Sequence, residues 1–315
     1  MKIVFMGTPE FACAPLTALQ NSEHTIVAVV TGPDKPAGRG KNLRASAVKE
    51  QAEQFGLPVL TPESLKSEEF YQELKKIAPD LIVIVAFRIL PERIFSLPKF
   101  GSINIHGSIL PKYRGAAPIQ WALINGEKET GLSSFLLKSK VDTGDIILQQ
   151  KTNIDDKENF DSLYNRLSQM AGPFLLDSIK KIESKDFKPA RQDEALSTPA
   201  PKLKSSDALI DFEKSAVKVH NLIRGLATRP GAFTFFRGKK IKVYASQLSD
   251  KTPENSAQPG SILSDKSQLL VQCDESVLEL TRLLPEGKRE MDGRSFLNGY
   301  RPESGESFDN KNLSA

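Results

Sequence analysis

Of the three histidines in the sequence, His106 is the one whose surroundings favour chemistry. It follows a short stretch, residues 102–105, that predicts a β-strand, and Asn104 lies two positions before it. Side chains at positions i and i+2 of a strand face the same side, so Asn104 and His106 should project together. For His24, which precedes a predicted strand, and His220, in a predicted helix, we expect structural or surface roles.

A carboxylate that could reach this pair lies in the segment Val141-Asp142-Thr143-Gly144-Asp145, between two predicted strands. Asp and Gly are common in turns, so an ordinary hairpin is one interpretation. In the functional interpretation, the turn brings Asp142 beside His106 and fixes the tautomer of the imidazole. The sequence offers no metal-ligand spacing and no recognisable Ser or Cys nucleophile. Asn, His and Asp together then favour acyl transfer without a covalent intermediate, and we expect no metal.

The elements around these residues alternate between strand and helix. Apolar runs at residues 2–6, 25–30, 59–60 and 81–87 predict strands, with helical patterns between them. The alternation is typical of a doubly wound, Rossmann-like α/β domain, in which ligands bind at the carboxyl ends of the strands. No G-x-G-x-x-G follows the first strand and no P-loop motif occurs, so neither NAD nor ATP binding has motif support.

The composition changes after a long predicted helix at residues 160–182. Residues 185–204 contain three prolines and few apolar residues, which predicts a linker. One amphipathic helix and several short alternating strands follow, and they predict a small β-barrel. The expected domains are therefore 1–184 and 205–315, joined by the linker 185–204, with a polar end from Pro302 that should be frayed.

Basic residues gather in two places. Residues 33–44 contain two prolines and two glycines, so we expect no regular structure there, and their basic residues are Lys35, Arg39, Lys41 and Arg44. Residues 201–245 contain ten basic and three acidic residues, a net charge of +7 in a chain whose total is +4. Such runs are usually solvated surface. Two basic elements around one site would instead suit a polyanion such as RNA.

Other features bear on where the protein acts. The longest apolar run, residues 81–87, is far shorter than the roughly 20 residues of a membrane span. The N-terminus has Pro9 and Glu10 where a signal peptide is apolar. The two cysteines form no disulfide framework, as suits a reducing compartment. We expect a cytoplasmic monomer with no membrane association and no obligate protein partner.

The motifs around His106 resemble those of the folate-dependent formyltransferases. The core pattern of that family stands here as Asn104-Ile105-His106, Ser108-Ile109-Leu110-Pro111 and Asp142-Thr143-Gly144. Further matches narrow the resemblance to the members that act on tRNA. They lie at residues 5–11, 33–43, 113–120 and 229–232, and the likeness covers about residues 2–300.

This resemblance implies that 10-formyltetrahydrofolate is the cosubstrate and that the acceptor is the α-amino group of methionine on initiator tRNA. Asn104, His106 and Asp142 would be catalytic. The folate would lie against two segments, which comprise Ala86, Phe87, Arg88, Ile89 and Leu90, and Ser108, Ile109, Leu110 and Pro111. The tRNA would bind the basic loop, through Lys35, Arg39, Lys41 and Arg44, and an OB-like C-terminal domain, through Lys204, Arg229, Lys239 and Lys240.

The sequence departs from the family pattern at Phe87-Arg88, where many members have Tyr-Gly. The change removes a hydroxyl and adds a charge beside the expected pterin. The alternative function is a formyl-folate hydrolase or a formyltransferase for a small amine, neither of which needs a basic second domain. A third reading is an RNA-binding module on an inactive scaffold, which would not need the Asn-His-Asp trio.

Overall fold

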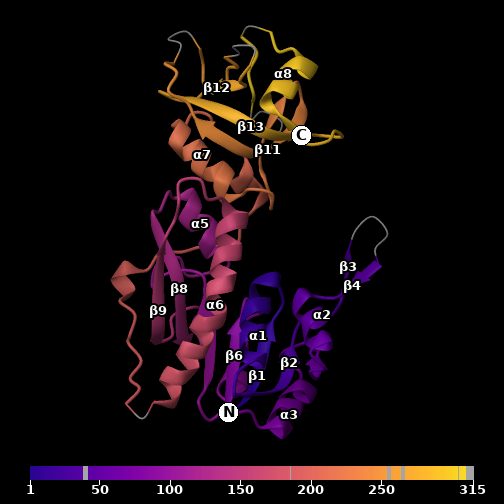
Figure 1. Cartoon of the computed structure of the whole chain (residues 1–315), viewed down its shortest axis with the longest axis vertical. Helices are drawn as coiled ribbons and strands as arrows, with labels where there is room; N and C mark the ends of the chain where they lie inside the picture. Colours follow the sequence, from indigo (N-terminus) through magenta and orange to yellow (C-terminus); the bar gives the residue numbers. More distant parts are fainter. Residues whose placement is uncertain (38–41, 185, 254–256, 264–266, 304, 310–315) are drawn as a thin grey trace. The chain divides into compact units, whose positions relative to one another are not determined.

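The computed structural model describes residues 1–37, 42–184, 186–253, 257–263, 267–303 and 305–309 (Figure 1). Two compact units can be distinguished. Unit 1 comprises Met1–Pro118, Glu129–Asn153 and Tyr164–Pro201, and unit 2 comprises Ile119–Lys128, Ile154–Leu163 and Lys202–Ala315. The chain thus enters unit 2 three times. The boundaries expected from composition, at 184 and 204, stay a prediction about independently folding domains.

A seven-stranded sheet forms the centre of unit 1. Its strand order is β5-β2-β1-β6-β7-β8-β9, in which the first five strands are parallel, β8 is antiparallel to β7, and β9 is antiparallel to β8. The strands are β1 (Lys2–Gly7), β2 (Thr25–Val30), β5 (Val59–Leu60), β6 (Leu81–Val85), β7 (Ser102–His106), β8 (Glu129–Leu136) and β9 (Ile146–Asn153). This order confirms the doubly wound α/β sheet that the alternating pattern predicts. The run predicted at 81–87 ends at Val85, because Ala86 turns the chain with φ 49°.

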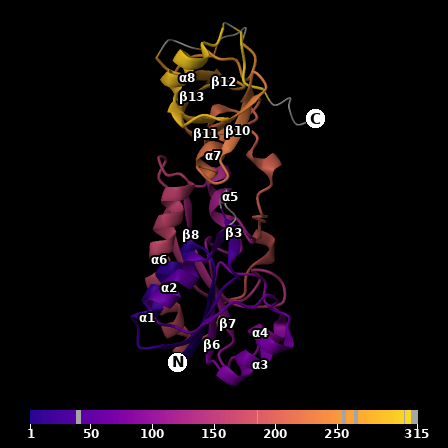
Figure 2. The same cartoon turned by 90° about the vertical axis from the view of Figure 1, so that its right-hand side faces the viewer.

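Helices cover both faces of this sheet. In Figure 2, β6 and β7 lie between α1, α2 and α6 on one side and α3 and α4 on the other. The helical bounds in unit 1 are η1 (Glu10–Ala12), α1 (Cys13–Gln20), α2 (Ala47–Gln54), α3 (Glu68–Ile77), α4 (Glu92–Phe95), η2 (Glu194–Leu196) and α6 (Phe160–Glu183), whose first residues belong to unit 2. All five residues of β6 are buried, as expected for a strand covered on both faces. Among the described residues, no helix combines the length and apolar character needed to cross a membrane.

The basic segment 33–44 contains a short hairpin, so the expectation that it lacks regular structure is wrong. β3 (Lys35–Ala37) pairs antiparallel with β4 (Asn42–Arg44) in a two-stranded sheet of their own. Pro36 is compatible with this arrangement because β3 has only one neighbouring strand, so the missing N–H can face outward.

Unit 2 is built from antiparallel strands and short helices. Its main sheet has the order β10-β11-β13-β12, and β14 pairs with β13. The elements are α5 (Pro118–Ile124), η3 (Ser205–Ala208), α7 (Ala216–Gly225), β10 (Ala232–Phe236), β11 (Lys239–Leu248), β12 (Leu270–Gln272), β13 (Val277–Pro285), β14 (Met291–Asp292) and α8 (Gly293–Tyr300). The sequence did not predict α8, since two glycines in eight residues weaken its helical propensity. The Asp292 carboxylate caps it by accepting from Ser295 N–H.

Aromatic side chains fill the core of unit 2. The ring centroids of Phe236, Phe296 and Phe308 lie 5.5–5.7 Å apart, in the range of favourable ring contacts. Phe308 is only 3% exposed, and its N–H donates to Gly260 O. The prediction of a frayed end from Pro302 is therefore wrong for residues 305–309, because one apolar side chain anchors an otherwise polar stretch.

We expect Phe296→Ala to destabilise unit 2 by about 3–5 kcal/mol, because Phe296 is fully buried in this cluster. Trp121 is the only tryptophan and belongs to unit 2, so its fluorescence during urea denaturation reports on this unit. Val217→Ala, at a half-exposed position of α7, serves as the control. Equal midpoints for the two variants would contradict the proposed importance of the cluster.

Candidate active site

The carboxyl end of β7 and the turn after β8 bring His106 and Asp142 together. β7 lies between β6 and β8, and His106 is its last residue. The Nδ1 atom of His106 lies 3.8 Å from Oδ2 of Asp142, and the two side chains are 7% and 12% exposed. Asn104 is half-buried on the same strand, two positions before His106. The structure thus assembles the expected trio at the edge of the sheet where α/β domains bind ligands.

The loop that follows β7 fixes the orientation of the imidazole. His106 Nε2 lies 2.8 Å from the carbonyl oxygen of Tyr113. Because a carbonyl can only accept, Nε2 carries a hydrogen, and Nδ1 is the nitrogen left facing Asp142. Gly115 N–H donates to Asp142 Oδ2 over 2.8 Å. One short loop therefore holds both members of the His–Asp pair.

The Asn104 carboxamide is available to a ligand. Its backbone is paired in the sheet opposite Ile84 and Phe135. Within the described ranges, its side chain makes no hydrogen bond to another residue. The NH2 group can therefore donate to an oxygen that develops negative charge beside His106.

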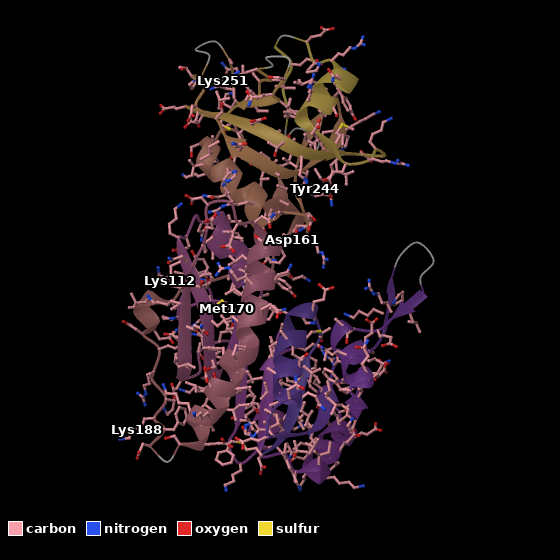
Figure 3. The ribbon with its side chains drawn as sticks, viewed as in Figure 1. Lys112, Asp161, Met170, Lys188, Tyr244 and Lys251 are labelled. Carbon is pink, nitrogen blue, oxygen red and sulfur yellow. The ribbon has the colours of Figure 1, made fainter. Side chains whose placement is uncertain are left out.

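The loop 108–111, expected to contact folate, is tied to the sheet. Ser108 Oγ donates to Lys112 O over 2.7 Å, and Ser133 Oγ donates to Ser108 O. Gln149 Nε2 donates to the carbonyl of Leu110, whose peptide bond to Pro111 is cis. Ser108 and Leu110 are buried, whereas Ile109 and Pro111 are half-buried. The four carbonyls of this loop and the Leu110 N–H are bonded within the protein, so the loop offers a ligand mainly the surfaces of Ile109 and Pro111. Lys112, labelled in Figure 3, is exposed.

The second expected folate segment, 86–90, leaves the neighbouring strand β6. Val85 pairs with Ile105, so this loop and the loop after β7 start beside each other at one edge of the sheet. Within it, Phe87 packs against the core under α3 and α4, and Leu90 is buried. Ala86 is exposed, and Ile89 is 77% exposed. The exposed apolar surface of Ile89 is free to cover a ring.

The guanidinium of Arg88 donates to backbone carbonyls and is not free for a ligand. Its Nη2 donates to Pro62 O over 2.9 Å and its Nη1 to Glu63 O over 3.2 Å. The guanidinium carbon lies 5.3 Å from the centroid of the Phe87 ring, a cation–π distance. The Arg88 side chain thus links the loop after β6 to the segment before α3, and a glycine at this position could not form that link.

The basic residues expected to bind RNA differ in how free they are. Lys35 and Arg44 are exposed and lie opposite each other in the β3–β4 hairpin, whereas Arg39 and Lys41 lie outside the described residues. Of the four residues expected to bind RNA in unit 2, Lys204, Arg229 and Lys239 are exposed and form no ion pair within the described part of the chain. Lys240 Nζ lies 3.6 Å above the ring of Phe233.

Two other arginines of the +7 segment are already engaged. Arg237 forms a two-bond ion pair with Glu306, and this pair lowers the pKa of Glu306 to about 2. Arg224 is 7% exposed, and its Nε donates to Asn221 Oδ1. The net charge counted from the sequence therefore overstates the free positive charge of this surface.

Gln192, which the sequence did not single out, contacts the Asp142 turn and is in turn held by Arg114. Gln192 Nε2 donates to Asp142 O over 2.9 Å and to Gly144 O over 2.7 Å. Arg114 donates to Gln192 Oε1 through Nε and Nη2. No local signal points to Gln192, because it lies 50 positions from Asp142 in a stretch predicted as linker.

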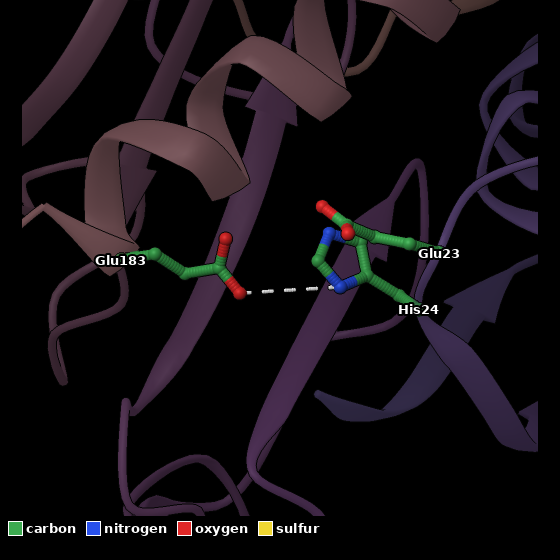
Figure 4. A group of neighbouring side chains, drawn as sticks. All are labelled: Glu23, His24 and Glu183. Carbon is green, nitrogen blue, oxygen red and sulfur yellow. Dashed lines mark ion pairs between the residues drawn. The ribbon is translucent and has the colours of Figure 1, made fainter.

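The remaining histidines have structural contacts. His24 Nδ1 lies 3.4 Å from the amino group of Met1 and 4.0 Å from Glu183, with Glu23 beside it (Figure 4). His220 Nδ1 lies 3.0 Å from Ser246 Oγ at a cavity of about 520 Å³ in unit 2, and burial lowers the pKa of this histidine. Neither group contains a residue of the trio.

Comparison with known proteins connects this geometry to a family. The family model "Formyl transferase" matches residues 1–179, and "Formyl transferase, C-terminal domain" matches residues 202–301. The chain is 42% identical over 307 residues to the "Methionyl-tRNA formyltransferase" of Caldanaerobacter subterraneus subsp. tengcongensis, covering 97% of this chain and 99% of that protein.

Solved structures share the fold. The sugar 3N-formyl transferase WlaRD superposes with a TM-score of 0.68 and 19% identity, over 92% of this chain and 99% of that one. HypX from Aquifex aeolicus gives a TM-score of 0.64 and 18% identity over 98% of this chain, which spans about half (49%) of the length of HypX. With family models matching both units and a full-length relative at 42% identity, the chain belongs to the formyl transferase family.

Proposed function

We propose that this protein transfers the formyl group of 10-formyltetrahydrofolate to the α-amino group of methionine on initiator tRNA, yielding formyl-methionyl-tRNA for translation initiation. The observation that carries the proposal is the assembled trio of Asn104, His106 and Asp142 in a chain that is 42% identical, over nearly its whole length, to a methionyl-tRNA formyltransferase. We expect a monomer that acts in the cytoplasm without a metal ion.

Each member of the trio has a distinct role in the reaction. The neutral amine of the aminoacyl ester attacks the formyl carbon, and the carbonyl oxygen becomes an oxyanion. The free carboxamide of Asn104 donates to that oxygen. His106 can add a second donor only when Nδ1 carries a hydrogen, because its Nε2 hydrogen is held by Tyr113 O. The attacking nitrogen loses its proton toward the Asp142 carboxylate, which is 12% exposed and faces His106. The bond between the formyl carbon and N10 then breaks, and N10 takes a proton as tetrahydrofolate leaves.

The loops after β6 and β7 would receive the folate. They start beside each other, and they present Ile89, Ile109 and Pro111 as apolar surfaces. A flat pterin ring suits such surfaces, because ligand pockets are lined predominantly by apolar side chains. Arg88 supports the loop through Pro62 and Glu63 rather than offering its charge to the ring.

Two basic surfaces support tRNA as the acceptor carrier. One is the β3–β4 hairpin with Lys35 and Arg44, to which Arg39 and Lys41 add charge in sequence. The other is the exposed set Lys204, Arg229 and Lys239 of unit 2. Lysines and arginines without carboxylate partners are available to neutralise phosphates, and phosphate contacts dominate the affinity of proteins for nucleic acids. A hydrolase or a small-amine formyltransferase has no use for these surfaces.

Asn104→Ala should lower kcat for formyl transfer to methionyl initiator tRNA by about 10²–10³-fold, because it removes an oxyanion donor. Asn153→Ala, at an exposed position at the end of β9, should match the wild type. Formate released from 10-formyltetrahydrofolate is measured alongside formyl-methionyl-tRNA. Release of formate without formyl-methionyl-tRNA in the wild type would favour the hydrolase alternative. A loss of less than about tenfold in the variant would remove Asn104 from the oxyanion site.

Lys239→Ala should weaken tRNA binding and make the slope of log K against log salt less negative by about one, the effect of one lost phosphate contact. The matched control is the double variant Arg237→Ala/Glu306→Ala, which removes a basic residue already neutralised by its partner. Binding is followed by fluorescence anisotropy over a series of salt concentrations. Identical slopes for the wild type and Lys239→Ala would exclude Lys239 from the RNA surface.

A further inference from the structure

We infer that Gln192 is a positioning residue for formyl transfer, and that residues 190–200 form part of the catalytic site rather than a passive connection. This inference rests on the proposed function. The stretch lies between the regions that the two family models match, residues 1–179 and 202–301. It belongs to unit 1, where it contacts both loops that hold the His–Asp pair.

One amide group holds the turn that carries Asp142. The two hydrogens of Gln192 Nε2 reach the carbonyl oxygens of Asp142 and Gly144, at 2.9 and 2.7 Å. These carbonyls flank Thr143, so a single side chain fixes the turn on both sides of its central residue. Since an unpaired carbonyl that is shielded from water is costly, the turn depends on this donor.

The turn has little freedom to adopt another shape by itself. Asp142 has φ 54°, a left-handed conformation that is uncommon for residues other than glycine. A Cβ on Gly144 would lie 1.6 Å from the carbonyl oxygen of Leu136, so the backbone here presses against β8. A strained turn of this kind persists only where its surroundings impose it. Gln192 supplies two of those constraints.

Gln192 is itself held in place. Its Oε1 accepts from Nε and Nη2 of Arg114, at 3.1 and 2.7 Å. The outer edge of the same guanidinium is paired with both carboxylate oxygens of Glu194, at 2.9 Å each. With its oxygen fixed by Arg114, the amide can present only its NH2 group to the turn, which sets the direction of both hydrogen bonds.

The rest of the stretch holds the partner loop. Arg114 N–H donates to Thr198 O, and Ala200 N–H donates to Arg114 O. Tyr113 N–H donates to Thr198 Oγ1 over 2.9 Å. The held loop supplies the Tyr113 carbonyl that orients His106 and the Gly115 N–H that binds Asp142. Residues 190–200 therefore fix the imidazole and the carboxylate relative to each other from both sides.

This arrangement predicts an effect on the chemical step rather than on substrate binding. Within the described part of the chain, the side chain of Gln192 forms hydrogen bonds only with backbone of the turn and with Arg114, and neither expected RNA surface includes it. Displacing a catalytic group by about 1 Å can cost on the order of 100-fold in rate. We expect Gln192→Met, which keeps the length of the side chain but forms no hydrogen bond, to lower kcat about 10- to 100-fold. The KM values for 10-formyltetrahydrofolate and tRNA should stay within about twofold of the wild type, because uniform binding is not touched.

The experiment compares Gln192→Met with Gln150→Met, the same substitution at an exposed position of β9. Steady-state kinetics with methionyl initiator tRNA give kcat and both KM values. Hydrogen–deuterium exchange of peptides covering residues 138–146 reports on the turn without reference to activity. Gln192→Met is also combined with Asp142→Asn, because a residue that acts through Asp142 should have little further effect once that carboxylate is gone.

The inference is supported if Gln192→Met lowers kcat, accelerates exchange in the turn, and costs no more than about twofold in the Asp142→Asn background. Unchanged kcat, or losses that multiply fully in the double variant, would overturn it. If the wild type formylates no tRNA, the proposed function fails, and hydrogen–deuterium exchange of the turn alone tests whether Gln192 holds it. Equal exchange of the turn in Gln192→Met and Gln150→Met would then reject that structural role of Gln192.

Discussion

The structure of the site depends on one constraint: the His106 imidazole is fixed between a carbonyl that only accepts and a carboxylate that faces it. Nε2 is bound to Tyr113 O at 2.8 Å, so Nδ1 is the nitrogen that meets Asp142. Neither partner lies on the strand that carries His106. The loop after β7 and the turn after β8 must therefore be held to a fraction of an ångström, and much of the surrounding structure serves that purpose.

Glycines and one long-range segment meet this requirement. A Cβ on Gly115 would lie 2.4 Å from Ala200 O, and Gly144 is equally confined by Leu136, so both backbones approach their neighbours as only glycine permits. These approaches place Gly115 N–H on Asp142 and bring the turn against β8. Gln192 and its neighbours, in a polar stretch that contains prolines, then close the arrangement through their hydrogen bonds to both loops.

In unit 2, the net charge of residues 201–245 predicts the free positive charge of the surface less well than the contacts of each basic residue do. The +7 segment suggested one broad basic surface, but Arg237 is neutralised by Glu306 and Arg224 is buried. The aromatic core explains another difference, because Phe308 draws residues 305–309 into the domain although their composition is polar. A single buried ring offsets the ordering cost of a short segment, which composition averages cannot reveal.

The sequence by itself determined the fold class and the presence of a second, antiparallel part, and it predicted the residues of the trio, because periodicity and the Asn-x-His and Asp-x-Gly spacings are local properties. Tertiary structure alone decided the 3.8 Å approach of Asp142 to His106, the nitrogen that faces it, and the contacts of Gln192. It also decided the contacts of Arg88. Asp142 and His106, Gln192 and Asp142, and Arg88 and Pro62 lie far apart in the chain, and such contacts leave no periodic trace in the sequence.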